Sequence, residues 1–173
     1  MAKSNHGKLK GIIGNAIVLL FSVFALAFMA LPYSAVTTTL GNNVSRVEGS
    51  SVFEAMGQIA DVTDANAKAS LVFFLLVAIV ACVLIITSIV GIVGAIIGNK
   101  KLNMTFINRI VTLVLVALAL VAMILAVAYT SSIGGGVGSA SITSSVSAGS
   151  VLPLVFAILA VIGAFVAPTK KKA

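Results

Sequence analysis

The sequence predicts an all-α membrane protein with a bundle of four transmembrane helices, and three observations lead to that prediction. Of the 173 residues, 60% are hydrophobic and only 9% are charged, whereas soluble domains carry about 25% charged residues. The apolar residues gather in four long runs. These runs are continuous rather than alternating, and continuous apolar segments in hydrocarbon satisfy their backbone groups as helices rather than as barrel strands.

The length of each run sets the predicted boundaries. A bilayer core of about 30 Å needs about 20 apolar residues at 1.5 Å each. Pro32 closes the first run, Pro153 falls in the first turn of the fourth, and Pro168 ends it, so no proline is expected to interrupt a span. The predicted spans are 11–31, 69–98, 110–130 and 151–167, separated and flanked by 1–10, 32–68, 99–109, 131–150 and 168–173.

The distribution of charge predicts the orientation of the spans. Positively charged flanks resist translocation and stay on the cytoplasmic side. All four acidic residues lie in the segment 32–68, whereas both tails and the segment 99–109 are basic and contain no acid. We therefore expect both termini in the cytoplasm and a small extracellular segment at 32–68. The nine cations with this topogenic and lipid-headgroup role are Lys3, Lys8, Lys10, Lys100, Lys101, Arg109, Lys170, Lys171 and Lys172.

The first outer segment shows local structure of its own. Residues 35–40 are rich in β-branched side chains, 41–43 form a turn signal, and 44–48 can return as a second strand of a β-hairpin. Ser51 and Glu54 have the spacing of a capping box at the start of a short helix. Asp61 and Asp64 suit a helix N-terminus, so the second long helix is expected to begin near Asp64.

The second outer segment, 131–150, permits two interpretations. Its Gly and Ser content is typical of a flexible linker. Its stretch 140–146 mixes β-branched with small residues and carries no charge, which would allow a strand beside the first hairpin. Both interpretations stay open at this point. The layout of four helices with a longer first outer segment is similar to the claudin-like tetraspan arrangement, although the chain has no Trp and no Cys pair, so no residue roles follow from that likeness.

Small residues on the second span predict close helix packing. Glycines at these spacings leave a helix face nearly bare, and bare faces let another helix approach within van der Waals contact. The sequence does not say whether that partner helix belongs to the same chain or to a second copy. The residues assigned to this packing face are Thr87, Gly91, Gly94 and Gly98.

Intramembrane polar groups are few and modest. Asn15 is the strongest candidate, because its amide could bond to another helix, although it could equally be satisfied at the membrane interface. Ser and Thr hydroxyls in helices usually bond back to their own backbone. A transport role would require Asn15 and the hydroxyl groups to line a path, the latter being Ser22, Thr87 and Thr112.

Residues for catalysis or metal binding are sparse. The spans contain no Asp, Glu, Lys, Arg or His, His6 is the only histidine, and Cys82 is the only cysteine. The cations are dispersed over three flanks without interleaved aromatics, which argues against a nucleic-acid partner. We expect neither an enzyme nor a cofactor.

These observations favour a structural, scaffolding protein of the cell membrane that self-assembles laterally through small-residue helix faces and outer loops. Its expected partners are the lipid bilayer and either further copies of itself or another membrane protein. The alternative is an accessory or pore-forming subunit of a membrane transport complex.

Overall fold

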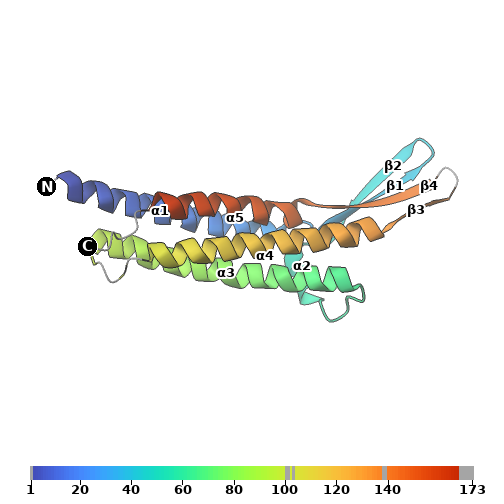
Figure 1. The fold of residues 1–173 in the computed structure, drawn as a ribbon. Helices are drawn as coiled ribbons and strands as arrows, with labels where there is room; N and C mark the ends of the chain where they lie inside the picture. Colours follow the sequence, from blue (N-terminus) through green and yellow to red (C-terminus); the bar gives the residue numbers. More distant parts are fainter. Residues whose placement is uncertain (1, 100–101, 103, 138–139, 168–173) are drawn as a thin grey trace. The chain divides into compact units, whose positions relative to one another are not determined.

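The computed structural model describes residues 2–99, 102, 104–137 and 140–167. The chain is mostly helical, and four of its helices are long and apolar enough to cross a membrane. The sequence prediction of a helical, multi-pass membrane protein is confirmed at this level. The four are α1 (Ala2–Ala27), α3 (Ala65–Ile97), α4 (Thr105–Ser132) and α5 (Ala148–Val166), labelled in Figure 1.

All four long helices begin before the predicted apolar spans, where polar residues continue the helix. The helix α1 includes most of the basic segment 1–10, and a short 3-10 turn, η1 (Phe28–Ala30), follows its end. The helix α4 begins at Thr105, inside the segment 99–109 predicted to be a loop. Its first two turns therefore carry the polar residues Asn108 and Arg109.

The chain forms two compact units, and each long helix contributes residues to both. The helical unit comprises Met1–Ala25, Ala78–Ala117 and Val155–Ala173. The sheet unit comprises Leu26–Val77 and Leu118–Leu154. All four acidic residues belong to the sheet unit, and nine of the 11 Lys and Arg residues belong to the helical unit.

Specific caps fix both ends of α3. Asp64 accepts a hydrogen bond on Oδ1 from the backbone N–H of Ala67 at 2.8 Å, so α3 begins beside Asp64, where the sequence placed its start. At the other end, Gly98 adopts a φ of 76°, and the N–H of Asn99 donates to the carbonyl of Gly94 at 3.0 Å. This is a Schellman cap, which requires the left-handed backbone that glycine adopts without strain.

The short helix α2 (Val52–Gly57) carries the predicted capping box. The N–H of Glu54 donates to Ser51 Oγ at 3.2 Å, and the N–H of Ser51 donates to the Glu54 carboxylate at 2.9 Å. Val52 is the buried residue of this helix, whereas Phe53 is partly exposed.

The position of Pro153 differs from the prediction. The helix α5 begins at Ala148, so Pro153 is its sixth residue and lies inside the helix rather than in the first turn. The reason lies outside the apolar run: the N–H of Gly149 donates to Pro32 O at 3.0 Å and Ser150 Oγ donates to Tyr33 O at 2.5 Å. These bonds hold polar residues in a helical turn that the hydrophobic pattern alone did not include. Pro168 lies outside the described residues.

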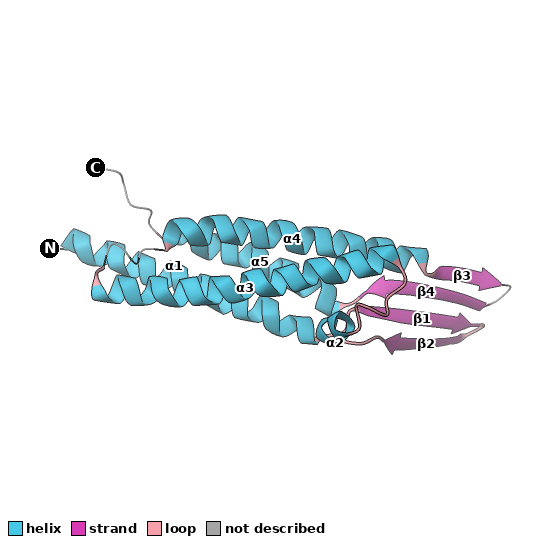
Figure 2. Ribbon diagram, turned by 90° about the horizontal axis from the view of Figure 1, so that it is seen from below, coloured by secondary structure: helices cyan, strands magenta, loops and turns pink. Residues whose placement is uncertain are grey.

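A four-stranded antiparallel sheet is the main difference from an all-α protein (Figure 2). The hairpin of β1 (Ser34–Leu40) and β2 (Asn43–Glu48) occupies the stretch where the sequence suggested one. The second outer segment forms β3 (Gly134–Val137) and β4 (Ala140–Val146), so the strand interpretation holds there and the linker interpretation does not. The strand order is β2-β1-β4-β3, and β1 pairs with β4 over seven residues.

A connecting segment of three residues, 31–33, joins η1 to β1 and accepts or donates hydrogen bonds on several sides. The carbonyl of Leu31 accepts from Val52 N at 3.2 Å, and the carbonyl of Tyr33 accepts from Ser147 N at 3.2 Å. A Cβ on Gly149 would collide with the carbonyl of Leu31 and lie 2.6 Å from that of Pro32. Only a glycine allows α5 to approach this segment so closely.

Candidate functional site

A buried pair of side-chain amides lies in the helical unit. Asn108 Nδ2 of α4 donates to Asn15 Oδ1 of α1 at 2.8 Å, and Asn15 Nδ2 donates to the carbonyl of Gly11 in its own helix at 2.9 Å. Both residues are at most 3% exposed. The sequence left Asn15 between an interhelical and an interfacial role, and the structure places it in an interhelical hydrogen bond.

The second span supplies the surface against which this pair packs. A Cβ on Gly91 would lie 2.8 Å from Asn15 Nδ2, so the absence of a side chain at Gly91 leaves the room that the amide occupies. Ser88 lies one turn before Gly91 on α3, and its Oγ is 3.5 Å from Asn108 Nδ2 of α4. Asn108 Oδ1 is buried without a hydrogen-bond partner among the described residues.

The other two glycines of the predicted packing face have different neighbours. A Cβ on Gly94 would lie 2.6 Å from Leu102 Cβ, which belongs to the connection between α3 and α4. Gly98 ends α3, and its nearest neighbour is Lys8 Nζ, 3.2 Å from the Cβ position. Gly91 and Gly98 therefore both lie beside side chains of α1, whereas Gly94 lies beside the connection that follows α3.

The remaining polar candidates do not join the amide pair. Thr87 Oγ1 donates to the carbonyl of Val83 at 3.0 Å, and Thr112 Oγ1 donates to that of Asn108 at 2.8 Å, so both hydroxyls bond within their own helices. Ser22 is fully buried, and its hydroxyl has no partner among the described residues. The structure brings Asn15 together with Asn108 and Ser88 rather than with the residues that a transport path was expected to use.

Arg109 caps the end of α5 instead of facing only solvent and lipid headgroups. Its Nη2 donates to Ala167 O at 2.7 Å and its Nε to Ala164 O at 3.0 Å, while the guanidinium lies 4.8 Å from the ring centre of Phe165. The last carbonyls of a helix lack intrahelical donors and carry partial negative charge. A planar guanidinium can satisfy several of them at once.

The other topogenic cations are described only in part. Lys8 lies beside the C-terminus of α3, where a cation complements the helix dipole, and Lys10 is exposed. The backbone of Lys3 lies in α1, but its side chain is outside the described part. The predicted cations that lie outside the described residues are Lys100, Lys101, Lys170, Lys171 and Lys172.

Small residues bring α1 and α5 together in the helical unit. A Cβ on Gly14 would lie 2.8 Å from Gly163 O, and a Cβ on Gly163 would lie 2.5 Å from Ile17 Cγ2. The alanines of α4 and α5 are also almost completely buried within the single chain. These are Ala119, Ala122, Ala126, Ala157, Ala160 and Ala164.

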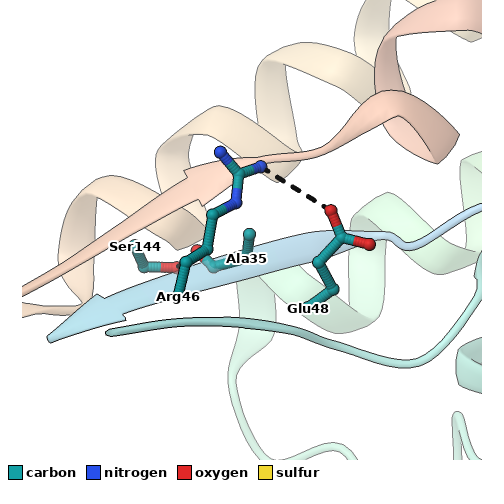
Figure 3. A network of polar contacts seen from close by, with 4 residues as sticks. All are labelled: Ala35, Arg46, Glu48 and Ser144. Atoms are coloured by element: carbon teal, nitrogen blue, oxygen red, sulfur yellow. Dashed lines mark hydrogen bonds and ion pairs between the residues drawn. The ribbon is translucent and has the colours of Figure 1, made fainter. Parts of the chain in front are cut away.

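The sheet leaves much of its surface open. All six residues of β2 are exposed, and Leu40, Val44 and Val47 are each more than 60% exposed. Arg46 and Glu48 lie on the same face of β2 with 3.9 Å between Nη2 and Oε1, and both side chains are more than half exposed (Figure 3). An exposed pair of this kind contributes about 0 to 1 kcal/mol.

One buried phenol lies at the base of the sheet unit. Tyr33 is 5% exposed, with the Phe74 ring edge-on at 6.1 Å and the Tyr129 ring stacked at 6.3 Å. Burial raises the pKa of Tyr33, and Tyr129 and Asp64 raise it further, while the nearby Ser70 lowers it. Ser70 Oγ donates to the carbonyl of Ala122 at 2.8 Å, and the Tyr33 hydroxyl has no partner with hydrogen-bond geometry among the described residues.

No cluster of three or more His, Cys, Asp and Glu side chains occurs among the described residues. Comparison with known protein families, curated proteins and solved structures finds no match for this chain.

The sequence contained a signal for Asn108, but the predicted start of the third span excluded this residue. Thr112, Ala119, Ala122 and Ala126 form a buried stripe on α4, and one turn before Thr112 the same stripe reaches Asn108. The predicted span began at residue 110, which placed Asn108 and Arg109 in a loop. Extension of the helical period by one turn would have found both.

Proposed function

We propose that this protein is a non-catalytic, structural membrane protein that assembles laterally with further copies of itself through its outer sheet. The observation that carries the proposal is the state of that sheet. Apolar side chains of β1 and β2 are exposed on it, and β2 is an edge strand whose residues are all exposed. Exposed apolar surface and open strand edges favour protein contact.

The packing of the helices supports the sheet, rather than the small-residue helix faces, as the surface of self-association. The small residues of α4 and α5 are buried against the same chain, and the space at Gly91 is filled by Asn15. The large apolar side chains on the outside of the helices, such as Ile86, Leu113 and Ile158, suit contact with lipid chains. The small-residue faces are therefore assigned to folding of one copy, and the sheet to association between copies.

The proposed orientation has both termini in the cytoplasm, the sheet outside, and the cell membrane as the location. The charge difference between the two units supports it, because the acids lie in the sheet unit and most cations lie in the helical unit. Single cysteines at Ser4, Ser50 and Ala173, in a Cys82→Ala background, test it in intact cells. Residue 50 should react with a membrane-impermeant maleimide, and residues 4 and 173 should react only after permeabilisation. Labelling of residue 50 only after permeabilisation would contradict the orientation.

Native mass spectrometry of the protein released from lipid nanodiscs tests self-assembly. We expect masses at multiples of the 17.5 kDa chain whose share rises with protein concentration. The matched variants are Leu40→Ser with Val44→Ser on the sheet, and Ile86→Ser with Ile158→Ser on the helices. The first pair should reduce the oligomer and the second should not. A protein that stays monomeric at every concentration would refute the proposed function.

A further inference from the structure

The free edge of β2 has a defined set of backbone groups. In an antiparallel pair, residues alternate between hydrogen-bonded and non-hydrogen-bonded positions. Gly49 N donates to Ser34 O at 2.9 Å, so Gly49 is a hydrogen-bonded position toward β1, and by alternation so are the odd-numbered residues of β2. The N–H and C=O groups of Val44, Arg46 and Glu48 therefore point away from β1. No described strand pairs with them, since β2 is the first strand in the sheet order.

We propose that β2 of a second copy pairs with this edge, antiparallel and in one register, with Val47 opposite Val47. This proposal deepens the self-assembly proposed above and rests on it. The register places Arg46 of each copy opposite Glu48 of the other. The two residues then form hydrogen-bonded pairs, so four backbone bonds and two ion pairs join the copies.

Charge selects this register from the symmetric alternatives. A two-fold axis perpendicular to the sheet requires a residue of β2 to face itself, so the strand can centre on Ser45, Arg46 or Val47. Centring on Arg46 places two guanidinium groups opposite each other, and like charges directly across a ladder are destabilising. Centring on Ser45 places Arg46 opposite Val44 and leaves Glu48 beyond the end of the paired strand. Only the Val47 register pairs both charges.

The same register also covers apolar surface on the face of β2 that carries Val47. Val47 is 65% exposed in the single copy and lies beside Val36 of β1 on the same face. In the proposed pairing Val47 meets Val47 of the second copy at a non-hydrogen-bonded position, where Cα atoms approach to about 4.5 Å. Pairing therefore covers exposed apolar surface on one face while it neutralises charge on the other. Arg46 and Glu48 exchange a weak contact within one strand for ion pairs across the ladder (Figure 3).

Disulfide trapping in lipid nanodiscs tests the register, with Cys82→Ala as background because Cys82 is the only native cysteine. Val47→Cys should form a disulfide-linked dimer under mild oxidation, because about 4.5 Å between Cα atoms suits a disulfide. Ser45→Cys is the matched control on the same face. In this register its two copies lie about four residues apart, roughly 13 Å, and should not form the disulfide. Cross-linking at residue 45 or 46 but not at 47 would overturn the proposed register.

Charge reversal separates contact between copies from contact within one. In the Val47→Cys background, Arg46→Glu and Glu48→Arg each place like charges opposite each other in a homodimer. Each alone should lower the yield of dimer by about threefold or more. A mixture of the two variants should restore it, because every cross-strand pair in the mixed dimer is then of opposite charge. Unchanged yields for the single variants, or no recovery on mixing, would overturn the pairing.

The outcomes also separate this inference from the function on which it rests. If native mass spectrometry shows oligomers but residue 47 does not cross-link, the edge pairing is wrong and self-assembly stands. If the wild-type protein is monomeric at every concentration, both are wrong.

Discussion

Gly14 of α1 lies so close to α5 that a methyl group on it would be 2.8 Å from the carbonyl oxygen of Gly163. Helix association in a bilayer depends on such close contact, because lipid chains solvate apolar side chains as well as a protein interior does. This crossing is therefore expected to carry a large part of the stability of the helical unit.

Gly14→Ala should destabilise the protein by about 1 to 3 kcal/mol, the usual cost of an overpacked core position. The matched control is Gly11→Ala one turn earlier, where the nearest atom, Ala95 Cβ, lies 3.7 Å from the new methyl group. That control should leave stability unchanged or raise it slightly, since alanine favours helix. Thermal unfolding in detergent, followed by circular dichroism, measures both. Equal melting temperatures for the two variants would contradict the close crossing.

The amide pair should show coupling in a double-mutant cycle. Asn15→Ala and Asn108→Ala each remove one partner of the 2.8 Å hydrogen bond. Interhelical hydrogen bonds in membranes contribute about 0.6 kcal/mol on average and up to about 1.7. We expect a coupling energy within that range from steric-trap or denaturant unfolding of the four proteins. Strict additivity would mean that the bond contributes nothing to folding.

Arg109 should stabilise the end of α5 through its fork geometry as well as its charge. Arg109→Gln removes the charge and most of the donors, and we expect a loss of about 1.5 to 3 kcal/mol. Arg109→Lys keeps a cation near the helix dipole but cannot reach several carbonyls, so its loss should be smaller. Hydrogen exchange of the last turn of α5 should rise in the order wild type, Lys, Gln. Equal exchange in Lys and wild type would show that charge alone is sufficient.

Gly149 should not tolerate a side chain. In Gly149→Ala the methyl group would meet the carbonyls of Leu31 and Pro32, which already accept hydrogen bonds from Val52 and Gly149. We expect a loss of about 3 kcal/mol or more, because backbone atoms cannot move aside cheaply. The control is Gly57→Ala in α2, where the added methyl group meets no atom within 4 Å. A melting temperature of Gly149→Ala equal to that of the control would refute this close approach.

Burial of Tyr33 predicts a loss of stability at alkaline pH. Its pKa in the folded protein is raised above the ordinary value of 10.0, chiefly by desolvation. Stability from this group is therefore complete below about pH 10, and it falls as pH rises from there through the folded pKa. Tyr33→Phe removes the titrating group, so the gap in melting temperature between variant and wild type should widen in the variant's favour above pH 10. A gap that stays constant from pH 8 to 11 would contradict the buried phenol.

The four long helices could be predicted because apolar run length alone identifies a span. Their polar ends could not be predicted in that way, since Thr105, Asn108 and Arg109 of α4 belong to no apolar run. The role of Asn15 was left open because its partner lies 93 residues away in the sequence. The role of Arg109 depends likewise on where α5 ends.

The sheet shows the same limit. The β1–β2 hairpin is local, and its turn has a sequence signal: Gly41 adopts a φ of 57°, and positive φ at the first central residue alone is the pattern of a type II′ turn. The strand β4 has no such local signal, because its register is fixed by pairing with a strand far away in the sequence. The sequence also did not show that Gly91 and Gly98 lie beside α1 while Gly94 lies beside the connection after α3, because a regular glycine spacing does not reveal where α3 ends.

The long separation of β1 and β4 in the sequence also sets a delay between the synthesis of β1 and the synthesis of its partner strand. Thr37 of β1 pairs with Thr143 of β4, 106 residues later in the chain. At roughly 5 to 20 residues per second, about 5 to 20 s pass between the synthesis of these two strands. A β1–β2 hairpin completed early therefore has two open edges until β4 is synthesised, and only the β1 edge is later closed by a strand of the same chain. Any factor that shields nascent strands at the membrane would have its longest opportunity to act on β1 in this interval.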